Sequence, residues 1–350
     1  MDKKLRAILV GCGGISGAWL TPIRQFDDVE IVGLVDLKPE NAAATKARFE
    51  LDRAEIGDDL TAMLKRLAPD LVFDCTLPEA HTKVATAALS CGAHVLGEKP
   101  MAVSMPEARQ AVAAAEKAGK IYAVIQNRRY MDNIVAFRKA VTDGCAGRLH
   151  TLNADFFIGA HFGGFREVMR HVLILDMAIH TFDQARHISG QDPLAVYCHE
   201  WNPPGSWYEH GASAIAIFEM SEGVIFRYQG SWCAEGMNTS WECQWRAIGD
   251  QGSMLWDGRE TIVGERPIAR QNLVSPVESF QRPIYTHLNH QGHAGVIREF
   301  LDCVRNGGRP QTDCRDNIKS LAMVHGAIKS AEQRRKVDLS SLADDLVCGS

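Results

Sequence analysis

Hydrophobic positions in the first third of the chain alternate between short continuous apolar runs and longer segments with helical spacing. The runs, which are typical of buried strands, cover residues 6–12, 29–36, 70–76, 94–99 and 121–127. The helical segments between them cover residues 14–26, 39–50, 81–92 and 105–119. Strands that alternate with helices of this length predict βαβ units and a doubly wound, mostly parallel sheet, an α/β fold.

The pattern changes after about residue 127 to segments rich in β-branched and aromatic residues. The predicted strands are 152–158, 195–201, 212–220, 224–232 and 241–249. Turn residues at 222–223 and 250–252 separate neighbouring strands, as in an antiparallel meander. One helix, roughly Glu167 to Ile188, interrupts this region, and helical stripes return near the C-terminus. We therefore predict two domains, residues 1–126 and 127–350.

Composition and charge exclude several classes of function. The net charge is -5 and no basic tract occurs, so the chain lacks the electrostatic footprint of a nucleic-acid-binding protein. No apolar stretch approaches the ~18 residues that span a bilayer, and the apolar run near the N-terminus is too short for an export signal. The cysteines are isolated, without a C-x-x-C pair. We expect a cytoplasmic protein that acts on a small molecule.

A glycine-rich loop lies between the first predicted strand and the first predicted helix. Gly11, Gly13 and Ser16 have the spacing of a dinucleotide-binding fingerprint, and Gly17 shares the third position with Ser16. The first glycine permits a tight turn, the second lets the backbone approach a pyrophosphate, and the helix N-terminus offers free N–H groups. The alternative is a glycine-rich turn with nothing bound. The loop residues predicted to face a cofactor are Gly11, Gly13, Gly14 and Ile15.

Asp36 ends the second predicted strand, where a carboxylate can accept hydrogen bonds from both ribose hydroxyls of NAD and repel the extra phosphate of NADP. An alternative role is a helix N-cap before Pro39. NAD is therefore the predicted cofactor, and the nearby Lys38 keeps NADP as the alternative.

Lys99 follows a short apolar run and precedes Pro100. Ligands of doubly wound sheets bind outside the carboxyl ends of the strands, so Lys99 is expected near the cofactor. The alternative is a surface Glu–Lys pair, but Pro100 fixes the backbone at a point where a surface strand end needs no such constraint.

Asp176 and His180 are four residues apart and share a face of the predicted helix. An aspartate one turn before a histidine can orient the imidazole and stabilise its protonated form, which general acid–base catalysis requires. Asp183, three residues further on, is a second carboxylate within reach. The alternative is a hydrogen-bonded core histidine.

Two other clusters contain residues that could take part in binding. His287, His290 and His293 recur in steps of three, which carries the side chains around a helix, so a pocket-lining loop is preferred and no metal site is predicted. Six of the seven tryptophans lie between 201 and 256. Packing in a sheet core is expected for most of them, whereas Trp207 is a candidate for stacking on a sugar ring.

Four stretches together resemble the Gfo/Idh/MocA oxidoreductases, the glucose–fructose oxidoreductase and inositol dehydrogenase group. They are "ILVGCGGIS", "DCTLPEAHTKVATAALSCGAHVLGEKPM", "QNRRY" and "LDMAIHTFD", and residues 292–339 are also similar. The resemblance implies a Rossmann domain and an α+β domain with an open, mostly antiparallel sheet that often mediates oligomerisation. It also implies closing helices, at about 291–336, that pack near the first domain, and a homodimer or homotetramer.

The resemblance assigns the catalytic set to Lys99, Asp176 and His180. It matches Thr76, Pro78 and His81 to a cofactor-proximal loop, and Asn127 and Arg128 to the segment that joins the lobes. Glu98 is predicted to contact the cofactor. One departure concerns substrate recognition, because many members carry three glycines where this chain has Arg170, His171 and Val172. The predicted substrate-binding residues are Lys99, Arg128, His161, Arg170, His171, Asp176, His180 and Trp207.

The predicted function is NAD(P)-dependent hydride transfer at a secondary alcohol of a sugar, sugar derivative or cyclitol. His180 takes the hydroxyl proton, Asp176 orients and supports the imidazole, and Lys99 stabilises the developing alkoxide. One alternative is glycoside cleavage by transient oxidation. The other is a non-catalytic sugar or dinucleotide sensor, which is less favoured because a sensor has no need to keep all three residues.

Overall fold

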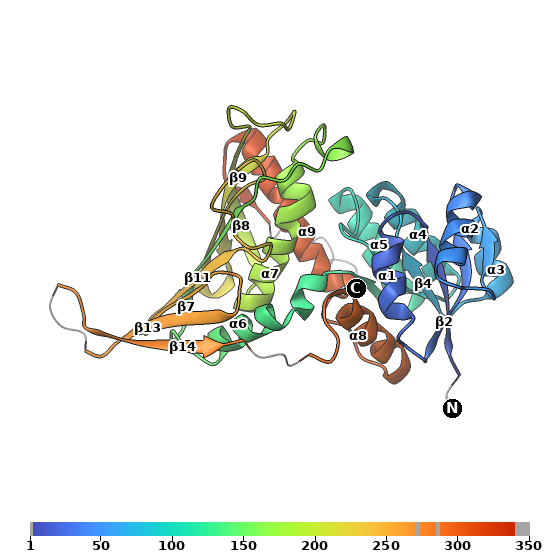
Figure 1. Ribbon diagram of the computed structural model, residues 1–350, viewed down its shortest axis with the longest axis horizontal. Coiled ribbons are helices and arrows are strands. Elements are labelled where there is room, and N and C mark those ends of the chain that lie inside the picture. The colour runs from blue at the N-terminus through green and yellow to red at the C-terminus, as the bar shows by residue number, and fades with distance from the viewer. Residues whose placement is uncertain (1–2, 270–272, 285–287, 340–350) are drawn as a thin grey trace. The chain divides into compact units, whose positions relative to one another are not determined.

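The computed structural model describes residues 3–269, 273–284 and 288–339 (Figure 1). The chain divides into two compact units. Unit 1 runs to Tyr130 and takes in Asn289–Ile318, and unit 2 runs from Met131 to Leu288 and resumes at Lys319. The division near residue 318 falls within helix α9, Cys314–Gln333. No helix among the described residues is both long and apolar enough to cross a membrane.

Unit 1 is built on a six-stranded sheet with the order β3-β2-β1-β4-β5-β6, in which all neighbouring strands are parallel. The predicted doubly wound fold is thus confirmed. Its strands are β1 Leu5–Val10, β2 Val29–Val35, β3 Glu55–Gly57, β4 Leu71–Asp74, β5 His94–Gly97 and β6 Tyr122–Val124. Its helices are α1 Ser16–Ile23, α2 Pro39–Arg48, α3 Leu60–Leu67, α4 Pro78–Ser90, α5 Met105–Ala118, the 3₁₀-helix η1 Asn127–Tyr130, and α8 Gly292–Asn306.

The central strands of this sheet are buried on both faces, which explains their continuous apolar runs. Their carboxyl ends are also in register, because Val10 pairs with Asp74, Asp74 with Gly97, and Gly97 with Val124. The loops that follow β1, β4, β5 and β6 therefore begin at the same edge. Since the strand order reverses between β1 and β4, this edge is where such sheets bind their ligands.

Unit 2 contains a nine-stranded sheet with the order β14-β13-β12-β11-β7-β10-β9-β8-β15. Strands β7 and β10 are parallel and the other paired neighbours are antiparallel, so the predicted mostly antiparallel sheet is confirmed. The strands are β7 Leu149–Phe157, β8 Pro193–Trp201, β9 Ser213–Met220, β10 Ile225–Ser231, β11 Gln244–Gly249, β12 Gly252–Trp256, β13 Thr261–Pro267, β14 Val277–Pro283 and β15 Val337–Asp338.

Helices α6 (Asp132–Thr142), α7 (Ile179–Ser189) and the second part of α9 pack on one face of this sheet (Figure 1). Phe137 and Phe182 bring these helices against aromatic side chains of the strands, among them Trp245 and Phe218. Trp232, Trp245 and Trp256 are fully buried, as expected for tryptophans in a sheet core.

The helix expected from Glu167 to Ile188 is wrong in its first part. Residues 167–171 are not helical, and a π-helix, η3 Leu173–Ala178, leads into α7. His171 has φ +56°, a left-handed conformation that a right-handed helix cannot contain. A short 3₁₀-helix, η2 Gly164–Arg166, lies upstream. Asp176 therefore lies in the π-helix and His180 in α7, so their four-residue spacing spans a change of helix type.

Asp28, just before β2, holds helix α8 in unit 1. Its two carboxylate oxygens accept hydrogen bonds from Arg298 at 2.9 and 2.8 Å, and one of them also accepts a bond from Arg305 at 2.9 Å. The hydrogen bond from Arg298 is the main reason that the pKa of Asp28 lies below its ordinary value, with both guanidinium charges assisting. Two arginines about two turns apart on α8 thus share one carboxylate.

We predict that Asp28→Asn lowers the free energy of unfolding by about 1–2 kcal/mol at pH 7. A lowered folded-state pKa means that the stabilisation is present above the unfolded value of 3.8 and is lost as the pH falls through the lower folded value. The difference between wild type and Asp28→Asn should therefore shrink on acidification. Urea denaturation at several pH values measures it, with the exposed neighbour Asp27→Asn as control.

Candidate active site

The glycine loop after β1 has the free space that a bound pyrophosphate needs. Gly11 has φ +87°, and a Cβ there would lie 2.6 Å from the carbonyl group of Cys75, so only glycine lets the loops after β1 and β4 touch. A Cβ on Gly13 or Gly14 would meet no atom within 4 Å. Packing within the protein does not require glycine at those two positions, whereas close approach by a phosphate does. The loop fits a dinucleotide.

Ser16 occupies the third position of the fingerprint. It is buried, and its hydroxyl donates to the Gly13 carbonyl at 2.6 Å. A Cβ on Gly17 would contact only the Arg48 side chain, at 3.6 Å. Ser16 rather than Gly17 therefore lies where α1 packs against the sheet.

The Asp36 carboxylate connects this loop to the start of α2. One oxygen accepts from the Cys12 N–H at 2.8 Å, and the other accepts from the Lys38 N–H at 2.9 Å and the Asn41 amide at 3.2 Å. The N-cap interpretation of Asp36 is wrong, because Lys38 is the N-cap of α2 and its cap has no side-chain hydrogen bond. Asp36 is partly exposed beside the loop, as a ribose-binding carboxylate must be.

The loop after β4 is organised by a buried aspartate, Asp74, that no sequence pattern marked as a site residue. Asp74 accepts from the Thr76 hydroxyl at 2.6 Å and the Thr76 N–H at 3.0 Å, and its other oxygen lies 2.9 Å from His81 Nδ1. Asp74 and His81 are both fully buried. Pro78 starts α4 between them. Thr76 and His81 thus hold the loop in shape through Asp74.

Glu98 is turned into unit 1 rather than toward solvent. One carboxylate oxygen accepts from the Trp19 indole N–H at 2.7 Å and lies 3.9 Å from His293 Nε2, and the other accepts from the Lys99 N–H at 3.2 Å. Burial by itself raises the pKa of Glu98, but His293, Trp19 and Lys99 together lower it below the ordinary value. Asn127 Nδ2 lies 3.3 Å from the other ring nitrogen of His293.

In unit 2, Asp176 is paired with Arg166. The Arg166 Nε–H donates to the Asp176 carboxylate at 2.7 Å, and the guanidinium lies 5.0 and 4.8 Å from the ring centres of Phe162 and Phe165. The Asp176 side chain is 17% exposed. Two aromatic faces and a carboxylate thus fix the arginine next to the residue expected to orient His180.

Three further predicted substrate-binding residues of unit 2 have side-chain contacts that fix their positions: His161, His171 and Trp207. His161 stacks on Trp207 with ring centres 3.7 Å apart, and Trp207 donates to the Ala160 carbonyl at 2.9 Å. His171 Nδ1 lies 2.5 Å from Glu200 and Nε2 lies 3.6 Å from Glu332. The hydrogen bond to Glu200 raises the pKa of His171.

The structure thus gathers two groups of predicted residues. In unit 1, the loops that carry Gly11–Ile15, Thr76–Pro78, Glu98–Lys99 and Asn127–Arg128 follow adjacent strands. In unit 2, Arg170 and His171 immediately precede the helical turns of Asp176 and His180. Sequence reasoning missed Trp19, Asp74 and Arg166 as members of these groups, and its pocket-lining loop is wrong for His293, which lies in helix α8. Among the described residues no cluster of three or more metal-ligating side chains occurs, and His287 lies outside them.

Comparisons with known proteins identify the family to which the two parts of the chain are similar. Residues 5–126 match an oxidoreductase family with an NAD-binding Rossmann fold, and residues 134–255 match the GFO/IDH/MocA C-terminal domain. A D-apiose dehydrogenase of Paraburkholderia graminis is 28% identical over 97% of this chain and 91% of its own length. A myo-inositol 2-dehydrogenase of Thermotoga maritima is 22% identical over 97% and 99%.

A solved oxidoreductase from Agrobacterium radiobacter, in complex with NAD+, L-tartaric acid and magnesium, superimposes with a TM-score of 0.86. It is 20% identical and covers 97% of this chain and 100% of its own, so it shares the fold of the whole chain.

We predict that Arg166→Gln lowers the turnover number about tenfold, because Asp176 loses the partner that fixes its carboxylate. Arg166→Lys keeps the charge but not the planar Nε–H contact, and should recover only part of the loss. Steady-state kinetics measure both variants. Arg259→Gln, which removes an exposed arginine 4.0 Å from Asp257, is the matched control, and equal effects at Arg166 and Arg259 would contradict the assignment.

Proposed function

This chain belongs to the Gfo/Idh/MocA oxidoreductase family, and on that premise we propose that it transfers a hydride between NAD and a secondary alcohol of a sugar, sugar derivative or cyclitol. The observation that carries the proposal is the glycine loop of unit 1. It leaves space at Gly13 and Gly14 at the same sheet edge from which Lys99 emerges. The sugar and inositol dehydrogenases among its relatives support the substrate class.

In the oxidation direction, His180 accepts the proton of the substrate hydroxyl. Asp176, itself held by Arg166, orients the imidazole and stabilises its positive charge. Lys99 stabilises the negative charge that develops on the substrate oxygen. Bound NAD would supply the hydride acceptor for the carbinol carbon. Gly11, Gly13 and the first turn of α1 would hold its pyrophosphate, and Asp36 would hold the adenosine ribose.

The substrate contacts of unit 2 come from the loop that precedes the helical turns of Asp176. His161 and Trp207 form one stacked pair that can bind the apolar face of a sugar ring. Arg170 is exposed and can reach a substrate hydroxyl, whereas His171 is held by two carboxylates. Arg128 of unit 1 is the remaining member of the proposed set. We also propose that the enzyme works in the cytoplasm as a homodimer or homotetramer.

A panel of sugars, polyols and cyclitols with NAD+ and NADP+, followed by absorbance of the reduced cofactor, tests the function. Oxidation of at least one member with NAD+ supports the proposal. Consumption of a glycoside without net NADH would instead indicate cleavage by transient oxidation.

We predict that Lys99→Ala and His180→Ala each lower the turnover number by about 10²- to 10⁴-fold, because each removes charge or proton handling from the transition state. NADH binding should persist in the His180 variant, measured by fluorescence titration. Turnover near the wild-type value in both variants, with NADH bound normally, would rule out these roles.

We predict that Asp36→Asn raises the KM for NAD+ about tenfold and improves activity with NADP+, because the carboxylate no longer binds the ribose hydroxyls or repels a phosphate. The kcat/KM ratio for the two cofactors measures this preference. Glu40→Gln is the matched control, since it removes an exposed carboxylate from the first turn of α2. An unchanged cofactor ratio in Asp36→Asn would refute the ribose contact.

A further inference from the structure

The Glu98 side chain lies within one residue of Lys99 and yet points away from solvent. It is 7% exposed, and a buried carboxylate is costly unless donors surround it. Its polar neighbours come from separate segments: Trp19 of α1 and the Lys99 N–H at the end of β5 donate hydrogen bonds to it, and His293 Nε2 of α8 lies 3.9 Å away. The carboxylate thus connects the phosphate-binding helix to the lysine-bearing strand end.

His293 extends this connection to Asn127. The Asn127 Nδ2 carries hydrogens, so the His293 Nδ1 at 3.3 Å acts as acceptor when the ring is neutral. The ring proton then lies on Nε2, which faces the Glu98 oxygen 3.9 Å away. This tautomer is assigned from the neighbouring donor. One imidazole therefore lies between Glu98, the residue before Lys99, and Asn127, the first residue of η1.

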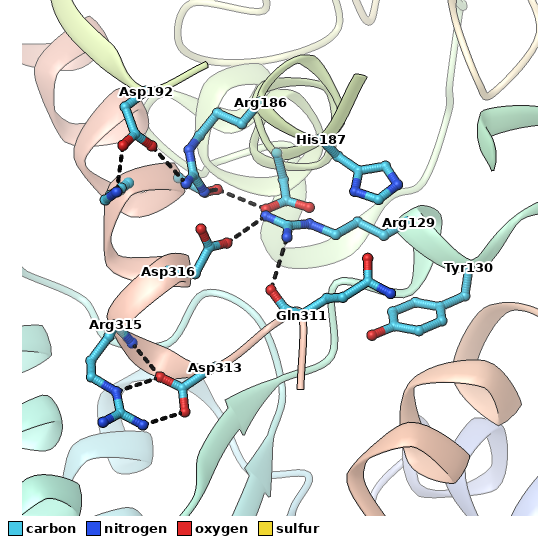
Figure 2. Close-up of polar contacts among 12 residues, drawn as sticks. Arg129, Tyr130, Arg186, His187, Asp192, Gln311, Asp313, Arg315 and Asp316 are labelled. Atoms are coloured by element: carbon cyan, nitrogen blue, oxygen red, sulfur yellow. Dashed lines mark hydrogen bonds and ion pairs between the residues drawn. The ribbon is translucent and has the colours of Figure 1, made fainter. Parts of the chain in front are cut away.

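The position of His293 does not depend on these contacts. Helix α8 approaches η1 because residue 295 is glycine, and a Cβ there would lie 2.7 Å from Tyr130 Cβ. The Tyr130 hydroxyl donates to Glu299 on α8. Next to Tyr130, Arg129 donates to the Gln311 carbonyl at 2.9 Å and to Asp316 at 2.8 Å (Figure 2). The close packing at Gly295 and the Tyr130–Glu299 bond hold α8 against η1, and the Arg129 bonds hold the segment that follows α8. We therefore expect α8 to keep its place when His293 is changed.

We propose that Glu98 and His293 are positioning residues for hydride transfer: Glu98 holds the backbone of Lys99, and His293 holds the Asn127 amide toward the cofactor. The inference rests on the proposed function. Its physical basis is that a displacement of about 1 Å at a reacting group can cost 10²-fold in rate. Neither residue belongs to the proposed substrate-binding set, and His293 belongs to a helix that no sequence pattern connects with Lys99.

A purely structural network would differ in a measurable way. If the contacts of Glu98 and His293 served only the stability of the fold, variants at these positions would lose thermal stability while the folded enzyme kept its kinetic constants. If the two residues position reacting groups, loss of the contact with Asn127 should lower cofactor affinity, and loss of the contact with Glu98 should lower turnover through Lys99. Two conservative substitutions at residue 293 can each remove one of these contacts and keep the other.

His293→Asn places an amide oxygen near the former Nδ1 and keeps an acceptor for Asn127, but it no longer reaches Glu98. His293→Gln places an amide N–H near the former Nε2 and keeps an N–H group facing Glu98, but it offers no acceptor to Asn127. We expect His293→Asn to bind NADH within twofold of wild type with turnover reduced about tenfold, and His293→Gln to show the reverse. His293→Leu should lose both properties. NADH fluorescence titration and steady-state kinetics with the most active panel substrate measure them.

Glu98→Gln tests the other member. The carbonyl oxygen of the introduced amide can still accept from Trp19, but its NH₂ group then faces the Lys99 N–H, and two donors repel each other. Turnover should fall about tenfold while NADH affinity stays within twofold. Trp19→Phe removes the indole donor without reversing a dipole at Lys99, so its turnover should exceed that of Glu98→Gln.

His290→Gln is the control, because His290 lies three residues before His293 and packs edge-on against Phe26, with ring centres 5.1 Å apart, outside this network. The inference is overturned if the two conservative variants match wild type in both properties, or if both properties fall together in step with thermal stability. Absence of NADH binding or turnover in the wild type would instead contradict the proposed function.

Discussion

The burial of a charged Glu98 is the constraint on which the candidate site of unit 1 depends. The carboxylate is surrounded by Trp19, the Lys99 N–H and His293 only when α1, β5 and α8 are all in place. Its burial therefore favours one arrangement of these three segments. Burial raises the pKa of Glu98, and its partners lower it further than burial raises it. The stabilisation is therefore present above the unfolded value of 4.5 and lost as the pH falls through the lower folded value.

Burial also determines which strands could be predicted from the sequence. Strands β1, β4 and β5 are buried on both faces, so their apolar runs are continuous and their positions could be predicted. Strand β3 has three residues and a mostly exposed pattern, and it gives no comparable signal. Strand β14 is exposed along nearly its whole length, and its pairing with β13 cannot be recognised from hydrophobicity.

The candidate site divides along a similar line. Gly11, Asp36 and Lys99 could be identified because each lies next to a strand end, where local sequence and fold together determine position. Trp19, Arg166 and His293 could not, because their roles arise from partners far along the chain or across a loop. His293 does stand out in a histidine series, but its spacing suggests a pocket-lining loop instead of a contact with Glu98. A long-range hydrogen bond leaves no periodic signal.

The loop before η3 is held by side-chain contacts at a position whose backbone conformation favours glycine. His171 keeps a backbone conformation that favours glycine, and a side chain there costs roughly 1–2 kcal/mol. Its ion pairs with Glu200 and Glu332 offset that cost and hold the loop against β8 and α9. Since Arg166 contacts Asp176 from the same loop, residues 160–171 would, under the proposed function, link substrate binding to the helical turns of Asp176 and His180. Under the proposed function, substitutions in this loop are therefore expected to change substrate preference while Lys99, Asp176 and His180 stay unchanged.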